Sequence, residues 1–435
     1  MYILQESLFS FEELQILESK EKLPIFFSAL DLRPYAKQLK SSSPQGAEGH
    51  SKEGILRALI AAPLEGIDTF TSLHNRLKND LRFRYQCGLD ISRPAPSIST
   101  LSRVFSSLTK TGLVKRIFQD LVQLAQEEGV IDGKHQAIDS AAIDAYEKKQ
   151  PKKRSEQTGN ANWGAKFDSF GNKITWFGYK MHLSVDTKSE LPMAIEVTPA
   201  HINDGDVAPQ LIEQVKSCTN SKIDFLIMDG GYDQLKNYES AKNIGAQAII
   251  PLNLRNEKEP PEGIASNGTP RCSMGYEMTY WGANKDQLKF RCPHATGKVD
   301  CPLGMAACSS SNYGMVVKIN VNKDLRRYSN PHRDSKRWKE LYNERTSVER
   351  CNSRMKSYLT ANSLHVWGID KVKTHIYLNA IVLLVSARAM AKESKSNKPL
   401  KKFLKRKILQ VRPKKDKQNI CKPKIQNTPI YLGFF

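Results

Sequence analysis

The first regular pattern along the chain is helical. Between residues 51 and 130, apolar residues recur at intervals of three and four, as Leu101, Val104, Phe105 and Leu108 do. This spacing places apolar side chains on one face of a helix. Because several short helices with basic residues follow one another, we expect an all-helical domain that either binds DNA or forms a structural cap.

The pattern changes to strands from residue 135. Residues 176–185 and 193–197 alternate between apolar and polar, and residues 187–190 are typical of a hairpin turn between them. Residues 225–228 are continuously apolar, which indicates a strand buried on both faces. Predicted helices separate the later strands, so we expect an α/β fold with a mixed sheet that is parallel in part.

Changes in composition divide the chain into six expected parts. A Pro-, Gly- and Cys-rich insertion interrupts the α/β region, which helices then complete. The parts are an N-terminal segment and linker (1–48), a helical domain (49–130), the first part of the core (131–254), the insertion (255–330), the C-terminal helices of the core (331–391) and a basic tail (392–435).

The chain is strongly basic, with a formal net charge of +21. Residues 392–424 contain fourteen Lys and Arg against two acids, so much of the excess lies in the predicted tail. A cationic surface favours a polyanionic partner, because binding releases the counterions of the phosphates. The N-terminus does not resemble a signal peptide, and the apolar run 380–385 is too short to span a bilayer, so we expect a cytoplasmic protein.

Two aspartates follow apolar strand segments. Asp139 comes after Ala137 and Ile138, and Asp229 ends the run of residues 225–228. Acids at the carboxyl ends of neighbouring strands point into a common crevice. Carboxylates placed in this way bind the two divalent ions that phosphoryl transfer requires. Asp132 and Asp144 lie close to the first of these positions and remain alternatives to it.

A predicted helix over residues 336–358 supplies a third acid. Tyr342, Arg345, Glu349 and Lys356 fall within an arc of about 60° on a helical wheel. Such a face offers one carboxylate to a metal ion, and two cations and a phenol to phosphates. An ordinary solvated face with an Arg345–Glu349 pair is the alternative.

Four segments together resemble a known family. The run Y-x2-R-x3-E-x6-K resembles the sequence around the third acid of bacterial insertion-sequence transposases of the DDE type. The segments AIDSAAIDA, FGYKMHLSVDTKSELPMAIEVTPAHINDGD and FLIMDGGYD resemble the blocks around their first and second acids. Residues 50–107, with LRFRYQCGL and STLSRVF, are similar to the N-terminal domain that precedes these catalytic domains.

The resemblance implies an RNase H-like core that cleaves transposon ends and transfers the strand to target DNA. It implies the catalytic and metal-binding residues Asp139, Asp229 and Glu349, with two Mg²⁺ or Mn²⁺ ions. It further implies that Tyr342, Arg345 and Lys356 contact DNA, that the substrate is double-stranded DNA, and that the protein assembles as a homo-oligomer on it. An RNase H-like nuclease that cuts without joining and a non-catalytic DNA-binding protein derived from a transposase remain alternatives.

Further candidate residues lie outside these segments. Lys152, Lys153 and Arg154 belong to a basic run after the first strand, which indicates either a phosphate-binding loop or a solvated hairpin tip. Nearby aromatic residues suit either stacking on a splayed base or core packing. His182 and Asp204 lie near the first two motifs, with a plain strand-surface histidine as the alternative. In the insertion, thiolates could bind a structural zinc ion or stay unligated; they are Cys272, Cys292, Cys301 and Cys308.

Overall fold

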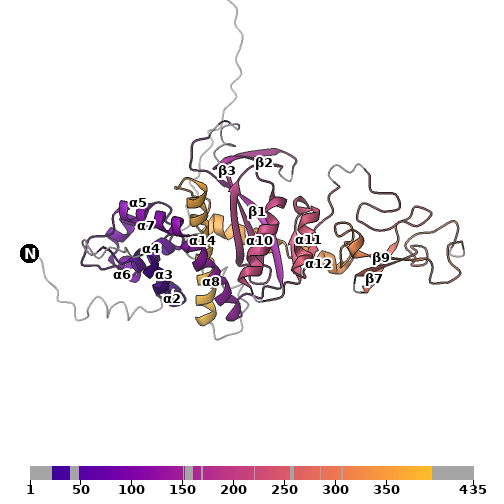
Figure 1. The fold of residues 1–435 in the computed structure, drawn as a ribbon, viewed down its shortest axis with the longest axis horizontal. Coiled ribbons are helices and arrows are strands. Elements are labelled where there is room, and N and C mark those ends of the chain that lie inside the picture. The colour runs from indigo at the N-terminus through magenta and orange to yellow at the C-terminus, as the bar shows by residue number, and fades with distance from the viewer. Residues whose placement is uncertain are drawn as a thin grey trace, which may run out of the picture.

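The computed structural model shows an elongated α/β protein. In Figure 1, N-terminal helices lie at one end, the main sheet lies in the middle, and the strands of the insertion lie at the other end. The structure describes residues 22–39, 49–149, 151, 160–167, 170–219, 221–254, 259–284, 286–304 and 307–393. One hydrophobic core joins the helical domain to the sheet, because its buried residues extend from Leu23 to Ala389.

The N-terminal region is all-helical, as predicted. Side chains of Ser51, Thr69, Asp80 and Ser97 begin four of the helices by accepting a hydrogen bond from a backbone N–H three residues later. The helices are α2 (Lys22–Ser28), α3 (Arg33–Gln38), α4 (Lys52–Leu64), α5 (Phe70–Asn79), α6 (Leu81–Gln86), α7 (Ile98–Thr111) and α8 (Leu113–Glu127).

The central sheet is mixed. Its strands are β1 (His135–Asp144), β2 (Asn162–Phe167), β3 (Lys173–Asp186), β4 (Pro192–Pro199), β5 (Phe225–Met228) and β6 (Gln247–Ile249). Strand β3 pairs antiparallel with β1, β2 and β4, whereas β1, β5 and β6 pair in parallel. The helices α10 (Asp204–Cys218) and α11 (Leu235–Asn243) connect the later strands. This arrangement confirms the predicted RNase H-like mixed sheet.

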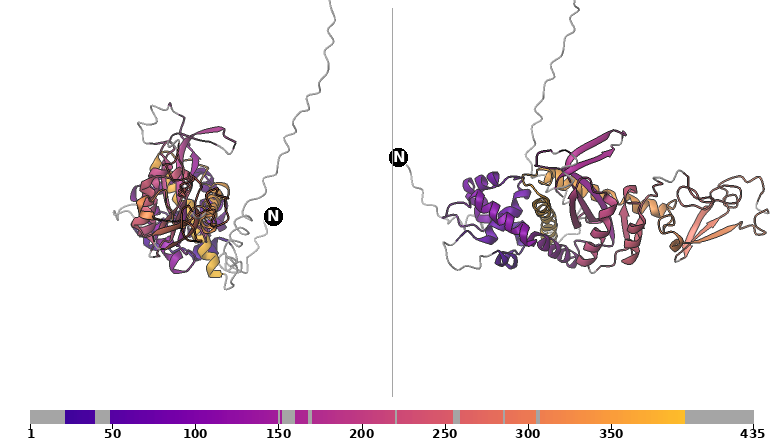
Figure 2. Two further views of the ribbon diagram at one scale, coloured as in Figure 1. Left: turned by 90° about the vertical axis from the view of Figure 1, so that its right-hand side faces the viewer. Right: turned by 45° about the horizontal axis from the view of Figure 1, so that its top comes forward.

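Strand β2 was not expected, because the polar composition of residues 145–175 favours a loop. Together with the first half of β3 it forms a two-stranded ribbon that projects from the sheet (Figure 2). The predicted hairpin between β3 and β4 is present, with its turn after Asp186.

The insertion contains a small sheet of its own, which its mixed composition had concealed. Strands β7 (Thr279–Asn284), β8 (Gln287–Arg291) and β9 (Val316–Asn320) pair antiparallel. They cover a separate hydrophobic cluster that includes Met278, Leu288 and Phe290. These strands are short and their apolar residues few, so periodicity alone could not identify them.

The predicted helix over residues 336–358 is wrong in detail, because three elements occupy that span. They are α12 (Lys336–Asn343), α13 (Thr346–Ser353) and the π-helix η3 (Arg354–Tyr358). The break after α12 turns the Glu344 carboxylate towards the sheet, where its Oε2 accepts a hydrogen bond from Thr187 Oγ1 at 2.8 Å. This contact ties the junction of α12 and α13 to the turn after β3.

The last described helix, α14 (Ile369–Glu393), is the central helix of the core. It packs on α8, α4 and β4. By length and apolar composition it could cross a membrane, but 94% of its most apolar window is buried inside the protein. Its apolar character is thus explained by the contacts it makes within this fold.

Candidate active site

The strand register brings the first two predicted acids together. Ile138 of β1 lies opposite Met228 of β5 in the parallel pair, so the next residues, Asp139 and Asp229, are neighbours where that pairing ends. The prediction that Asp139 ends its strand is wrong, because β1 continues to Asp144 along β3. The functional edge is therefore the end of the parallel pairing rather than the end of β1.

A tight turn holds the second acid. Residues Gly230–Tyr232 form the short 3-10 helix η1 directly after Asp229, and the Asp229 Oδ1 accepts a hydrogen bond from the Gly231 N–H at 2.8 Å. A Cβ on Gly231 would lie only 2.9 Å from that oxygen. The glycine therefore allows the carboxylate to fold back over the turn while its other oxygen stays available.

Asp139 lies in a strongly perturbed environment. Burial and the negative charge of Asp229 raise the pKa of Asp139 to about 7, although the Ser140 N–H and Arg345 act in the opposite direction. A second negative charge, on Asp204, adds to the effect. A buried carboxylate whose ionisation is disfavoured by burial and by a neighbouring negative charge forms a binding place for a cation.

Arg345 joins the third predicted acid to the first. Its Nη2 donates to Glu349 Oε1 at 2.6 Å, and its Nη1 donates to Asp139 Oδ2 at 3.4 Å. Helix α13 begins just after Arg345 and packs on β1 and β3, and Glu349 lies in its first turn with an exposed side chain. Arg345 thus connects Glu349 to Asp139, whose neighbour across the parallel pair is Asp229.

The other two residues of the predicted cationic face occupy different surroundings. Tyr342 stacks on Trp338 with 5.0 Å between the ring centroids, and its phenol pKa is raised by burial. Lys356 donates from Nζ to the Ala142 carbonyl oxygen at 2.8 Å. Burial and the charge of Lys166 lower the pKa of Lys356. The predicted face is therefore spread over α12, α13 and η3 rather than one continuous helix, and Lys356 contacts the β1 backbone.

The alternative first acids lie elsewhere. Asp132 pairs with exposed Lys188 at 3.3 Å, before β1 begins. Asp144 is exposed at the far end of β1, opposite Gly178. Neither adjoins Asp229, so the geometry favours Asp139 over both.

Glu190 is a functional candidate that sequence reasoning missed. It lies in the β3–β4 turn, where its carboxylate accepts from Arg350 Nε at 2.7 Å and from Arg354 Nη1 at 2.8 Å. Burial alone would raise its pKa, but the two guanidinium groups outweigh that effect and lower it. Both arginines follow Glu349, by one and five residues, so Glu190 ties the segment after the third acid to the β3–β4 turn.

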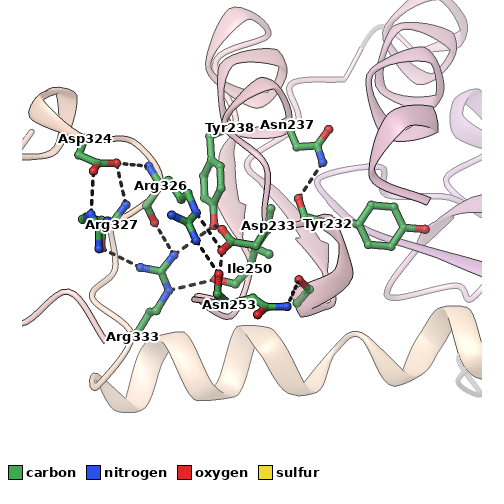
Figure 3. A network of polar contacts seen from close by, with 11 residues as sticks. Tyr232, Asp233, Asn237, Tyr238, Ile250, Asn253, Asp324, Arg326, Arg327 and Arg333 are labelled. Atoms are coloured by element: carbon green, nitrogen blue, oxygen red, sulfur yellow. Dashed lines mark hydrogen bonds and ion pairs between the residues drawn. The ribbon is translucent and has the colours of Figure 1, made fainter. Parts of the chain in front are cut away.

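A second missed network lies just after the second acid in the chain and centres on Asp233 (Figure 3). Asp233, four residues after Asp229, is buried and accepts hydrogen bonds from Tyr238 Oη at 2.7 Å, Asn253 N at 2.8 Å and Arg326 Nε at 3.0 Å. Arg326 comes from the end of the insertion. The loop after β5 is therefore tied directly to that segment.

Arg333 completes this network. Its guanidinium donates to the backbone oxygens of Ile250 at 3.0 Å, Arg326 at 2.8 Å and Arg327 at 2.8 Å, and to Tyr238 Oη at 3.2 Å (Figure 3). The residue is 7% exposed. Such a buried, saturated guanidinium fixes the exit of the insertion against β6.

The predicted His182 candidate is buried rather than on the strand surface. Its Nε2 lies 2.8 Å from Thr198 Oγ1, and burial lowers its pKa to about 4. Lys180 donates to Asp204 at 2.8 Å beside it. The imidazole is therefore neutral at neutral pH, and Asp204 acts on Asp139 through its charge.

Several predictions lie outside the described residues, namely Lys152, Lys153, Arg154 and the basic tail. Trp163 packs edge-on against Phe177 at 5.5 Å, as a core aromatic does. Among the residues that the structure describes, no three His, Cys, Asp or Glu side chains lie close enough to hold a metal ion. The predicted zinc site is therefore not formed; its four residues, all free thiols, are Cys272, Cys292, Cys301 and Cys308.

By the same criterion, the three acids do not form a metal-binding cluster among the described residues either, and Arg345 bridges two of them, Asp139 and Glu349. Their oxygen donors are the ligands that Mg²⁺ and Mn²⁺ prefer, and the repulsion between Asp139 and Asp229 would be relieved by a bound cation. The chemistry of the site thus fits divalent ions, provided that Arg345 gives up its contacts with Asp139 and Glu349.

The raised pKa of Asp139 predicts how the metal-free protein responds to pH. The folded state holds this proton up to about pH 7, whereas the unfolded chain releases it near 3.8. Stability that is present below pH 3.8 is therefore lost as pH rises to about 7. Measured by urea unfolding in EDTA at pH 5 and pH 8, wild type should lose on the order of a few kcal/mol more than Asp139→Asn. Equal losses in the two proteins would contradict this prediction.

Comparison with known proteins identifies the family. A model of the transposase DDE domain matches residues 131–385, more than half of the chain, and a model of the transposase domain DUF772 matches residues 11–107. The chain therefore belongs to the DDE transposase family. It is accordingly an enzyme of DNA transposition, and the predicted family and activity are confirmed.

The comparisons with curated proteins and with solved structures do not define the family more closely. None of the curated proteins matches the chain. Among solved structures, a piggyBac transposase in a synaptic complex with hairpin DNA is similar, with 11% identity and a TM-score of 0.37 over 89% of this chain and 79% of that one.

Proposed function

We propose that Asp139, Asp229 and Glu349 are the catalytic acids of this transposase and hold two divalent metal ions, Mg²⁺ or Mn²⁺. The observation that carries the proposal is the convergence of these residues from β1, the end of β5 and α13. The two ions would supply charge stabilisation to the attacking and leaving oxygens of a phosphodiester.

The remaining residues of the site position DNA. We infer that Arg345 moves from Asp139 and Glu349 to a DNA phosphate when the acids take up metal, because its guanidinium then has no carboxylate to neutralise. Tyr342, stacked on Trp338, presents a rigid phenol beside the acids. Lys356 contacts DNA from its place against β1. No protein nucleophile is needed, since water and then a 3′-hydroxyl attack the phosphodiester.

The partners follow from this chemistry. We propose double-stranded DNA of the transposon ends and of the target as substrates. Joining both ends of an element to one target requires that the two ends be held together, so we propose that copies of the chain assemble on DNA. Sizing of the protein–DNA complex by light scattering would test the assembly.

Metal placement can be tested without any turnover. Fe²⁺ replaces Mg²⁺ at oxygen sites, and with ascorbate and peroxide it produces hydroxyl radicals that cut the nearest backbone. We expect cuts near residues 139, 229 and 349, suppressed by excess Mg²⁺. Asp144→Ala should leave the cuts unchanged, and Asp229→Ala should remove them. Cuts elsewhere, or an unchanged pattern in Asp229→Ala, would refute the assignment.

A further inference from the structure

The insertion sheet has two faces of different chemistry. Because side chains alternate along a strand, Leu288 and Phe290 of β8 and their neighbours Val317 and Ile319 of β9 enter the small core. The opposite face, called the outer face below, is aromatic and cationic. It consists of Trp281, Lys289, Arg291 and Lys318, with Tyr313 lying over it.

Two rings hold the central cation of the outer face. The Arg291 guanidinium carbon lies 4.2 Å from the Trp281 ring centroid and 3.4 Å from that of Tyr313. Its Nη2 and Nε also donate to the Tyr313 carbonyl oxygen, at 2.8 and 3.2 Å. Lys289 Nζ donates to Tyr313 Oη at 3.0 Å. The two cations are therefore fixed in place before any ligand arrives.

The charges of the outer face are not balanced from within the protein. Lys289 and Lys318 lie directly opposite each other in the β8–β9 pair, an arrangement that destabilises a sheet. In the part of the chain that the structure describes, Arg291 and Lys289 donate to Tyr313 rather than to a carboxylate, and Arg291 itself is buried. Trp281 and Tyr313 are nevertheless 49% and 38% exposed. An external anion would relieve the repulsion between the lysines.

We propose that the outer face binds the phosphate backbone of double-stranded DNA, independently of sequence, at a place separate from the catalytic acids. The proposal rests on DNA being the partner of this transposase, as proposed above. Phosphates supply the missing negative charge, and Lys289 and Lys318, on adjacent strands, can contact a backbone without reading its bases.

The position of the sheet supports this role. The strands β7 and β9 lie at the end of the elongated molecule opposite the N-terminal helices (Figure 1). The network of Asp233, Arg326 and Arg333 ties the end of the insertion to the core beside Asp229 (Figure 3). A duplex held on the outer face is therefore held at a set place relative to the acids.

The test is the salt dependence of DNA binding by the full chain. Affinity for a long duplex is measured by fluorescence anisotropy between 50 and 200 mM salt, in EDTA, for Lys289→Ala/Lys318→Ala. We expect weaker binding at every salt concentration and a slope of log affinity against log salt that is smaller by about 2. The matched control is Lys298→Ala/Lys323→Ala, which removes two exposed lysines of the same insertion away from the outer face. It should retain nearly the wild-type slope.

Each of the remaining outcomes would refute either the outer-face site or the proposed DNA partner. Equal slopes for the wild type and the outer-face variant, or equal losses in both double variants, would overturn the outer-face site. A loss confined to single-stranded DNA would also overturn it, in favour of bases stacking on Trp281. Because EDTA removes metal, failure of the catalytic assignment would not affect this measurement. A wild-type protein that does not bind DNA would refute the proposed partner itself.

Discussion

Asp229→Ala should abolish DNA cleavage and strand joining while leaving DNA binding intact. Asp229 adjoins Asp139 across the β1–β5 pair and raises its pKa, so its carboxylate forms half of the anionic pair that attracts metal. Loss of a metal ligand removes several kcal/mol of charge stabilisation, and we expect a rate decrease of at least about 10³-fold. Binding should persist, because the change removes a negative charge from a surface that meets phosphates.

The measurement uses DNA carrying the flanks of the gene, with Mg²⁺, and follows both nicked and joined products. Asp224→Ala is the matched control, since Asp224 precedes the same strand but lies at its opposite end beside Lys222. Undiminished cutting by Asp229→Ala would remove this residue from the active site. Cleavage without joined products in the wild type would mean that the assay lacks a component of strand transfer, because the family transfers strands.

Features that depend on neighbouring residues could be predicted from the sequence, whereas features that depend on contacts between distant residues could not. Strand β5 and Asp229 were predictable, because a short apolar run followed by Gly230 and Gly231 is a local signal. The closeness of Asp139 and Asp229 was also predictable, since the carboxyl ends of paired parallel strands lie at the same edge of the sheet. The pairing of Glu349 with the same edge did not follow from local patterns and came from the family resemblance.

The missed features all depend on contacts between distant residues. Helical periodicity cannot show that Glu344, at the junction of α12 and α13, accepts a hydrogen bond from Thr187, because the two residues are 157 positions apart. In the sequence, Asp233 resembles an ordinary turn residue, because its partners Arg326 and Asn253 are distant in the chain. The strands of the insertion are likewise defined by a core of a few residues that meet only after folding.

Glu190→Ala should destabilise the protein and displace the third acid. The carboxylate is the shared partner of Arg350 and Arg354, and Arg354 also donates to the Glu190 carbonyl oxygen at 2.7 Å. Removing one partner of a buried pair leaves a charge without compensation, and we expect a loss of about 3 kcal/mol in the free energy of unfolding. Arg350 is partly exposed and can regain water, so Arg354 carries most of this effect.

The backbone indicates that the Glu190 side chain matters. Glu190 has a φ of 61°, in the left-handed region where glycine would be favoured. A glutamate is present there despite that preference, and its side chain reaches Arg350 and Arg354, which follow Glu349 by one and five residues. The turn therefore combines a strained residue with the anchor of an active-site segment.

The consequence can be measured as a stability effect and a catalytic effect together. Urea unfolding should show the loss in Glu190→Ala, whereas Lys188→Ala, an exposed change in the same turn, should stay within about 0.5 kcal/mol of wild type. Well below the unfolding midpoint, the folded variant should need more Mg²⁺ for half-maximal cleavage, because Glu349 is no longer held against the sheet. Glu190→Gln keeps the shape and should recover part of the stability. An unchanged Mg²⁺ requirement in a destabilised Glu190→Ala protein would show that the turn supports the fold but does not position Glu349.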